Sequence, residues 1–165
     1  IASRIASAYI DIIRGTPTTV QLLIMWSGIL ATCKNSVLIA SLTFGINSGA
    51  YVAEIVRAGI LAVDKGQMEA ARSLGLSYAK SMQKIILPQA VRICLPSLVN
   101  QFIITLKDST ILYAIGLSEV MYNAKIYVGR TMESFATYTW VAVFFLLIVT
   151  VLSFISRYVE RRMNA

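Results

Sequence analysis

The sequence predicts an all-α membrane protein with about four spanning helices. Hydrophobic residues make up 57% of the 165 residues and charged residues only 14%, whereas an average soluble domain carries about 25% charged residues. The mean hydropathy is +0.70. The apolar residues also lie in long uncharged stretches that short basic segments separate. The length suits a single domain.

The apolar stretches set the positions of the expected spans. These lie near residues 16–33, 36–56, 90–115 and 137–157, after a mildly amphipathic segment over residues 1–15. Pro17 suits the first turn of a new helix, where its missing N–H does no harm. The uncharged part of the first stretch is short, because a span needs about 20 apolar residues, and it becomes adequate when Gly15 to Pro17 are included.

Small residues mark a packing face in the second span. Gly45 and Gly49 form a GxxxG pair that Ala53 extends, and this spacing lets a neighbouring helix approach closely. We expect ordinary packing within the chain, with a dimer interface as the alternative.

The third and fourth spans have distinct internal signals. Pro96 is expected to kink the third span, which Lys107 and Asp108 interrupt. The fourth span has Trp140 near one end and Tyr158 at the other, which matches the aromatic belts at membrane interfaces.

Two basic clusters predict the orientation in the membrane. The first contains six basic residues against Asp64 and Glu69, namely Arg57, Lys65, Arg72, Lys80, Lys84 and Arg92. The second contains Arg157, Arg161 and Arg162 near the C-terminus. Cytoplasmic segments of membrane proteins are enriched in Lys and Arg. Counting spans places both clusters on the cytoplasmic side, with residues 116–137 outside, so the two clusters predict the same topology.

The polar segment over residues 64–88 is predicted to form two short helices around a turn. Gly75 suits the left-handed position that ends a helix. Ser77 can cap the next helix, which we expect to end at Pro88. The small side chains of Ala70 and Ala71 provide a smooth face for another protein. The alternatives are a DNA-reading helix-turn-helix, against which the flanking spans argue, and a solvated linker without a partner.

Four motifs in this chain resemble one known family. They are Glu69-Ala70-Ala71 with Gly75 and Ile85-x-Leu87-Pro88, then Arg14-Gly15-Thr16-Pro17, then residues 49–60, and finally residues 106–110. Together they resemble permease subunits of ABC importers in the polar amino acid uptake branch. The resemblance implies the type I (MetI-like) transmembrane fold with five spans, so the chain is expected to be a single transmembrane domain over residues 1–165 that lacks the first span.

The resemblance also implies partners. The loop over residues 64–88 is expected to dock into a dimer of cytoplasmic ABC ATPase subunits through eight residues: Glu69, Ala70, Ala71, Arg72, Gly75, Ile85, Leu87 and Pro88. That partner would use ATP with Mg²⁺. No GxxxxGK[ST] motif is present, so we expect neither an ATPase site nor a cofactor in this chain.

Further expected partners follow from the same family. They are a second permease copy or a homologue, an extracytoplasmic amino acid binding protein or fused binding domain, and the lipid bilayer, but no nucleic acid. The expected location is the bacterial inner membrane, with several spans and a cytoplasmic C-terminus.

Ionisable residues in or beside apolar segments are candidates for the substrate path. These are Glu54, Lys107 and Asp108, because a charge at the centre of a span costs about 2.5–3.5 kcal/mol. Lys107 and Asp108 could hold the two charges of an amino acid. The alternative is that these charges pair with each other or with Arg57.

Polar residues near the same spans could line the same cavity. These candidates are Tyr51, Gln101 and Thr105, with Asn100 beside them, and Gln101 and Thr105 share a helix face. Such residues also serve as hydrogen-bond links between helices.

Other functions remain as alternatives. One is a permease for another small polar solute, such as an opine or an amino acid derivative; another is a passive channel, which needs no ATPase dock. A membrane-embedded enzyme would have few candidate catalytic side chains, because histidine is absent and the two cysteines, Cys33 and Cys94, stand far apart in the sequence. We expect both to be unpaired thiols.

Overall fold

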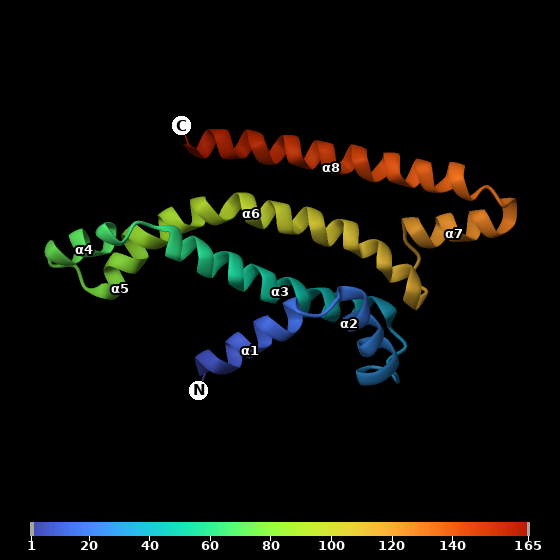
Figure 1. Ribbon diagram of the computed structural model, residues 1–165, viewed down its shortest axis with the longest axis horizontal. Coiled ribbons are helices and arrows are strands. Elements are labelled where there is room, and N and C mark those ends of the chain that lie inside the picture. The colour runs from blue at the N-terminus through green and yellow to red at the C-terminus, as the bar shows by residue number, and fades with distance from the viewer. Residues whose placement is uncertain (1, 165) are drawn as a thin grey trace.

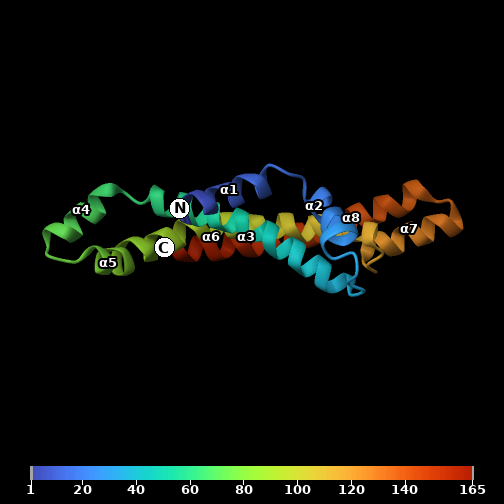
Figure 2. The same cartoon turned by 90° about the horizontal axis from the view of Figure 1, so that it is seen from below.

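The computed structural model describes the backbone of residues 2–164 and the side chains of residues 3–158 (Figures 1 and 2). This described part is built of helices joined by short turns. In chain order the α-helices are α1 (Ala2–Arg14), α2 (Thr18–Ile24), α3 (Ser36–Ala62), α4 (Lys65–Ser73), α5 (Tyr78–Ser81), α6 (Leu87–Asp108), α7 (Val120–Thr131) and α8 (Ser134–Asn164). Two π-helical segments, Met25–Ile29 and Met82–Ile86, follow α2 and α5, and a 3₁₀ segment, Ser109–Ile115, follows α6.

Three helical stretches in the described chain are long and apolar enough to cross a membrane. They cover Ser36–Ala62, Tyr78–Ile115 and Ser134–Tyr158, and they confirm the second, third and fourth expected spans. The stretch expected over 16–33 forms a shorter apolar helix, Thr18–Ile29. It ends early because a π-helical segment leads into a turn before Cys33, and Asn35 then caps α3 by accepting from the Leu38 amide.

The break between α1 and α2 has a local cause. The Gly15 amide donates to the Asp11 carbonyl over 2.8 Å, and a Cβ on Gly15 would lie 2.8 Å from that same oxygen. Pro17 is extended (φ −64°, ψ 137°) and stands at the N-cap of α2, where no N–H is needed. Pro17 therefore begins a new helix, as the sequence predicts.

The core lies along α3. This helix packs against α1, α2 and α6. One buried cluster joins α2, α3 and the 3₁₀ segment through Leu22, Ala40, Leu112 and Ile115. A second cluster, Val63, Ile86 and Ala90, joins the end of α3 to the start of α6. By contrast, none of the apolar window of α8 is buried within the chain.

The prediction that Pro88 ends a helix is wrong. Helix continues from Tyr78 through Pro88 to Ile115. The π-helical segment explains this continuity, because the Leu87 amide donates to the carbonyl of Met82, five residues back. Proline then occupies the first turn of α6, where its missing N–H is tolerated. Pro96 lies inside α6 as expected.

The helices give the molecule an elongated shape with two distinct ends (Figure 1). The hairpin of α4 and α5 forms one end, and α7 lies at the other. Helix α8 runs back from α7 so that its C-terminal part lies toward the α4–α5 end. This matches the expectation that the two basic clusters share one side, although the side chains of Arg161 and Arg162 lie outside the described residues.

Candidate functional site

The α4–α5 hairpin, residues 64–78, has a fixed backbone at both ends of α4. Asp64 caps the start by accepting from the Gly66 amide over 2.6 Å. At the other end Gly75 has φ +82°. The Leu76 amide donates to the Ala71 carbonyl (3.2 Å) and the Gly75 amide to the Arg72 carbonyl (3.0 Å). These bonds form a Schellman motif, which favours glycine, and Ser77 caps the following helix by accepting from the Lys80 amide.

The eight predicted coupling residues lie on the hairpin and on the helix that follows it, and they differ in exposure. Ala71 is only 2% exposed, and Ile85 is half-buried. The other six are exposed: Glu69, Ala70, Arg72, Gly75, Leu87 and Pro88. The sequence motif therefore combines a buried residue and a half-buried residue with six that are exposed to solvent.

Two large exposed side chains on the hairpin were missed by the sequence reasoning. Leu74 is 83% exposed and Tyr78 is 58% exposed. Both lie beside Gly75, at the tip of the hairpin. Their apolar character within a polar segment could have indicated a contact surface.

A charged cluster connects α1 with α3. The Arg57 Nε atom donates to Glu54 over 2.9 Å. The guanidinium of Arg14, at the end of α1, lies 3.9 Å from the same carboxylate and 5.4 Å from the centre of the Tyr51 ring. The structure thus brings Tyr51 and Glu54 together around Arg14. The Glu54–Arg57 pair agrees with the alternative hypothesis that Glu54 pairs with Arg57 instead of contacting the substrate. Arg14 is a partner that the sequence reasoning missed.

A second polar group connects α3 with α6. The hydroxyls of Ser48 and Thr105 lie 3.4 Å apart, and Thr105 donates to the Gln101 carbonyl over 3.0 Å. Gln101 is buried, at 8% exposure. Gln101 and Thr105 therefore share the face of α6 that packs against α3, as their spacing predicts.

Lys107 and Asp108 lie apart from these groups, at the end of α6. Lys107 is exposed and Asp108 is half-buried. Among the described side chains, the ion pairs within 4.0 Å involve Glu54 with Arg14 and with Arg57, and neither Lys107 nor Asp108 takes part in one. The Ser48–Thr105 contact marks one level at which α3 and α6 lie side by side. From that level Glu54 lies further along α3 and Asp108 lies further along α6, in opposite directions. At about 1.5 Å per residue, the two carboxylates are roughly 13 Å apart along the helix axis. The candidate path residues therefore fall into separate groups.

Comparisons with known proteins identify the family of this chain. The model of the family described as binding-protein-dependent transport system inner membrane component matches residues 1–165. The chain belongs to this family.

Relatives and a solved structure narrow the class of this permease. The glutamine transport system permease protein of Escherichia coli is 40% identical over 169 residues, which cover 99% of this chain and 77% of the relative. The arginine transport system permease protein of Bacillus subtilis is 38% identical over 164 residues, covering 98% and 75%. The crystal structure of an amino acid ABC transporter with histidines matches with a TM-score of 0.90 and 42% identity, over 96% of this chain and 75% of that chain.

These comparisons identify the permease as the membrane-spanning subunit of an amino acid importer, with the MetI-like fold. The permease is a multi-pass inner-membrane protein. Within its described residues, no group of three or more His, Cys, Asp or Glu side chains lies close enough to hold a metal ion.

The expected small-residue packing in the permease is only partly seen. Gly49 faces α1, where a Cβ would lie 3.1 Å from the Tyr9 hydroxyl, whereas a Cβ on Gly45 would meet nothing within 4 Å. Ala53 is exposed. The prediction of packing within the chain is therefore confirmed for Gly49 and wrong for Gly45. Residues four apart point in slightly different directions around a helix, so Gly45 and Gly49 do not face the same neighbour. The dimer interface stays a prediction for Gly45.

Proposed function

We propose that this permease carries a polar amino acid across the membrane and that a separate cytoplasmic ATPase drives the transport by docking on the α4–α5 hairpin. The observation that carries this proposal is the capped hairpin with an exposed tip. Leu74 and Tyr78 provide apolar contact area there, and the exposed Glu69 and Arg72 provide charges beside it. Exposed apolar groups within a polar rim are typical of protein contact sites.

The ATP chemistry belongs to the partner in this proposal. ATP with Mg²⁺ binds to the ATPase dimer, and the permease contributes no ATPase site, since its sequence contains no phosphate-binding glycine motif. The basic residues near the hairpin support a cytoplasmic location for it, with the C-terminus on the same side. Exposed helix faces, above all α8, would contact lipid or a second permease copy or homologue.

The substrate class rests on the relatives and on the path residues. The relatives named above carry the words glutamine and arginine in their names, which supports a polar amino acid with its charged amino and carboxylate groups. Lys107 and Asp108 are suited to these two groups, because neither has an ion-pair partner among the described residues. The Tyr51–Glu54 group and the Gln101–Thr105 group would line other parts of the path. An extracytoplasmic binding protein, or a fused binding domain, would deliver the substrate.

The test is reconstitution of the full-length permease with its ATPase and binding protein in proteoliposomes. Uptake of labelled amino acids is measured with ATP, without ATP, and with a non-hydrolysable analogue. We expect uptake only with ATP and only for some polar amino acids. Uptake without ATP would identify a passive channel, and transport of other solutes alone would overturn the amino acid class.

A further inference from the structure

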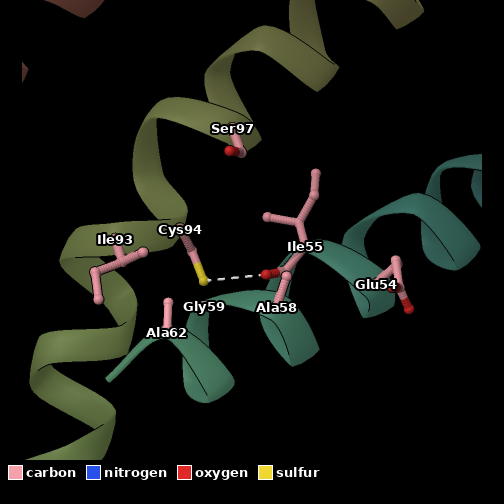
Figure 3. Close-up of a pocket in the computed structure, with 8 residues that line it drawn as sticks. All are labelled: Glu54, Ile55, Ala58, Gly59, Ala62, Ile93, Cys94 and Ser97. Carbon is pink, nitrogen blue, oxygen red and sulfur yellow. Dashed lines mark hydrogen bonds between the residues drawn. The ribbon is translucent and has the colours of Figure 1, made fainter. Parts of the chain in front are cut away.

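Helices α3 and α6 meet where the Cys94 thiol fills the space that a Cβ on Gly59 would need. Gly59 of α3 is buried. A Cβ on Gly59 would lie 2.0 Å from the Cys94 Sγ atom and 3.2 Å from the Ala90 carbonyl oxygen of α6. Both distances are shorter than ordinary van der Waals contact, so the thiol occupies the space that a larger residue would need. Figure 3 shows Cys94 directed from α6 toward α3 at this point.

Cys94 also binds the α3 backbone. Its side chain is only 4% exposed, and Sγ lies 3.4 Å from the Ile55 carbonyl oxygen, to which it donates (Figure 3). The thiol therefore contacts two successive turns of α3, at Ile55 and at Gly59. A side chain held in this way resists sliding of one helix along the other.

The contact lies between the α4–α5 hairpin and the charged cluster. On the hairpin side, Val63, Ile86 and Ala90 are buried together, and residues of α4 and the π-helical segment pack against them. On the other side, Glu54 is five residues before Gly59, roughly 7.5 Å along the helix at about 1.5 Å per residue. Glu54 is paired there with Arg57 and lies near Arg14 of α1.

We propose that the Gly59–Cys94 contact joins α3 and α6 into one rigid unit that transmits displacement of the α4–α5 hairpin to the Glu54–Arg57 pair. Gly59 and Cys94 are positioning residues in this inference, since neither needs to touch the substrate or the ATPase. The inference rests on the proposed function, because the displacement comes from the docked ATPase. If the two helices move as one unit, the Glu54–Arg57 pair moves whenever the hairpin moves.

Substitution of Gly59 tests the contact directly. In Gly59→Ala the added methyl group would displace the Cys94 thiol and separate the helices. We expect the complex to hydrolyse ATP while ATP-dependent uptake falls well below that of the unmodified complex, because overpacking of this contact forces the two helices out of their close fit. Gly28→Ala is the matched control, because a Cβ on Gly28 would meet nothing within 4 Å, and its uptake should be normal.

Two double variants separate this contact from a general loss of folding. Gly59→Ala with Cys94→Ala should restore uptake, since the remaining neighbours of the new Cβ are the Ala90 oxygen at 3.2 Å and the residue-94 Cβ at 3.6 Å. Gly59→Ala with Cys94→Ser should stay defective, because a hydroxyl still occupies the thiol position. Equal behaviour of the two double variants would overturn the inference.

Labelling of Cys94 gives a second measurement that does not depend on a Gly59 variant. Residues 1–165 contain two cysteines, so Cys33→Ala leaves Cys94 as the single thiol within them. A membrane-permeant maleimide should modify Cys94 equally slowly in the ATP-free complex and in the complex trapped with ADP and vanadate. Faster labelling in the trapped complex would mean that α3 and α6 separate, and would overturn the inference.

The outcomes distinguish the two proposals. Absence of ATP-dependent uptake by the unmodified complex would overturn the proposed function and this inference with it. Normal coupling in Gly59→Ala, with ATP-dependent uptake by the unmodified complex, would overturn this inference alone. If Gly59→Ala fails to insert, the rate of Cys94 labelling in the two states of the complex tests the inference instead.

Discussion

Asn47 of α3 donates a hydrogen bond from Nδ2 to the Oε1 atom of Gln21 in α2, over 3.0 Å. Gln21 donates in turn from Nε2 to the Ile13 carbonyl (2.7 Å) and to the Thr16 hydroxyl (2.7 Å). Asn47 is 5% exposed. This pair of amides therefore links α3 to residues on both sides of the break between α1 and α2.

Asn47→Ala should destabilise the permease. The substitution removes the donor and leaves the Gln21 carbonyl oxygen without this partner, and hydrogen bonds between membrane helices contribute about 0.6 kcal/mol on average and up to about 1.7. A lower thermal unfolding midpoint of the detergent-solubilised complex is the expected result. Asn100→Ala is the control, since Asn100 is exposed on α6. Equal midpoints for the two variants would contradict this structural role.

Gly75→Ala should disturb the tip of the hairpin and uncouple transport. The left-handed conformation of Gly75, with φ +82°, costs a residue with a Cβ about 1–2 kcal/mol. We expect normal insertion but reduced ATP-dependent uptake, and Gly75→Asp should behave alike. Gly129→Ala is the control, because Gly129 lies within α7 and its Cβ would meet nothing within 4 Å. Uptake and insertion are measured on the same membranes, and normal uptake by Gly75→Ala would count against the coupling role.

Glu69→Lys should weaken assembly with the ATPase. Glu69 is exposed on α4 and makes no ion pair within 4.0 Å among the described side chains, so charge reversal should leave the fold intact and act on the partner. Co-purification of the ATPase with the permease should drop, and uptake should drop with it. Gln67→Lys places a lysine on another face of α4, and it should retain the ATPase. If both variants assemble equally well, Glu69 does not contact the ATPase.

Asp108→Asn should impair substrate handling while leaving the coupling to ATP intact. The substitution keeps the shape of the side chain and removes its charge, so an amino group of the substrate would lose its partner. Uptake at low substrate concentration should fall while the ATPase activity of the assembled complex persists. Asp11→Asn, at an exposed position of α1, is the control. Unchanged substrate affinity in Asp108→Asn would remove Asp108 from the path.

Local signals in the sequence predicted the hairpin well. The end of α4 near Gly75 and the cap at Ser77 each depend on a few neighbouring residues, so the residue types at those positions were enough to predict both features. The long spans were predicted for a similar reason, because an apolar run of sufficient length is itself the requirement for crossing lipid.

Contacts between distant segments were not predictable in the same way. Nothing in the local sequence indicates that Cys94 packs on Gly59, 35 residues away, or that Arg14 reaches Glu54. Pro88 was misread because a proline usually ends a helix, whereas a π-helical segment before it accommodates the missing hydrogen bond. Which residues of two helices meet depends on how each helix is rotated about its axis and how far it is shifted along its partner. Hydropathy alone determines neither.

The continuous helix from Tyr78 to Ile115 is long compared with the thickness of a membrane. Its 38 residues extend over roughly 57 Å at about 1.5 Å per residue. A bilayer with its headgroups is only about 40–45 Å thick. The helix is therefore longer than the bilayer is thick, and it begins at Tyr78, directly after the cap of the hairpin, so no flexible linker separates the proposed docking surface from the membrane-spanning helix.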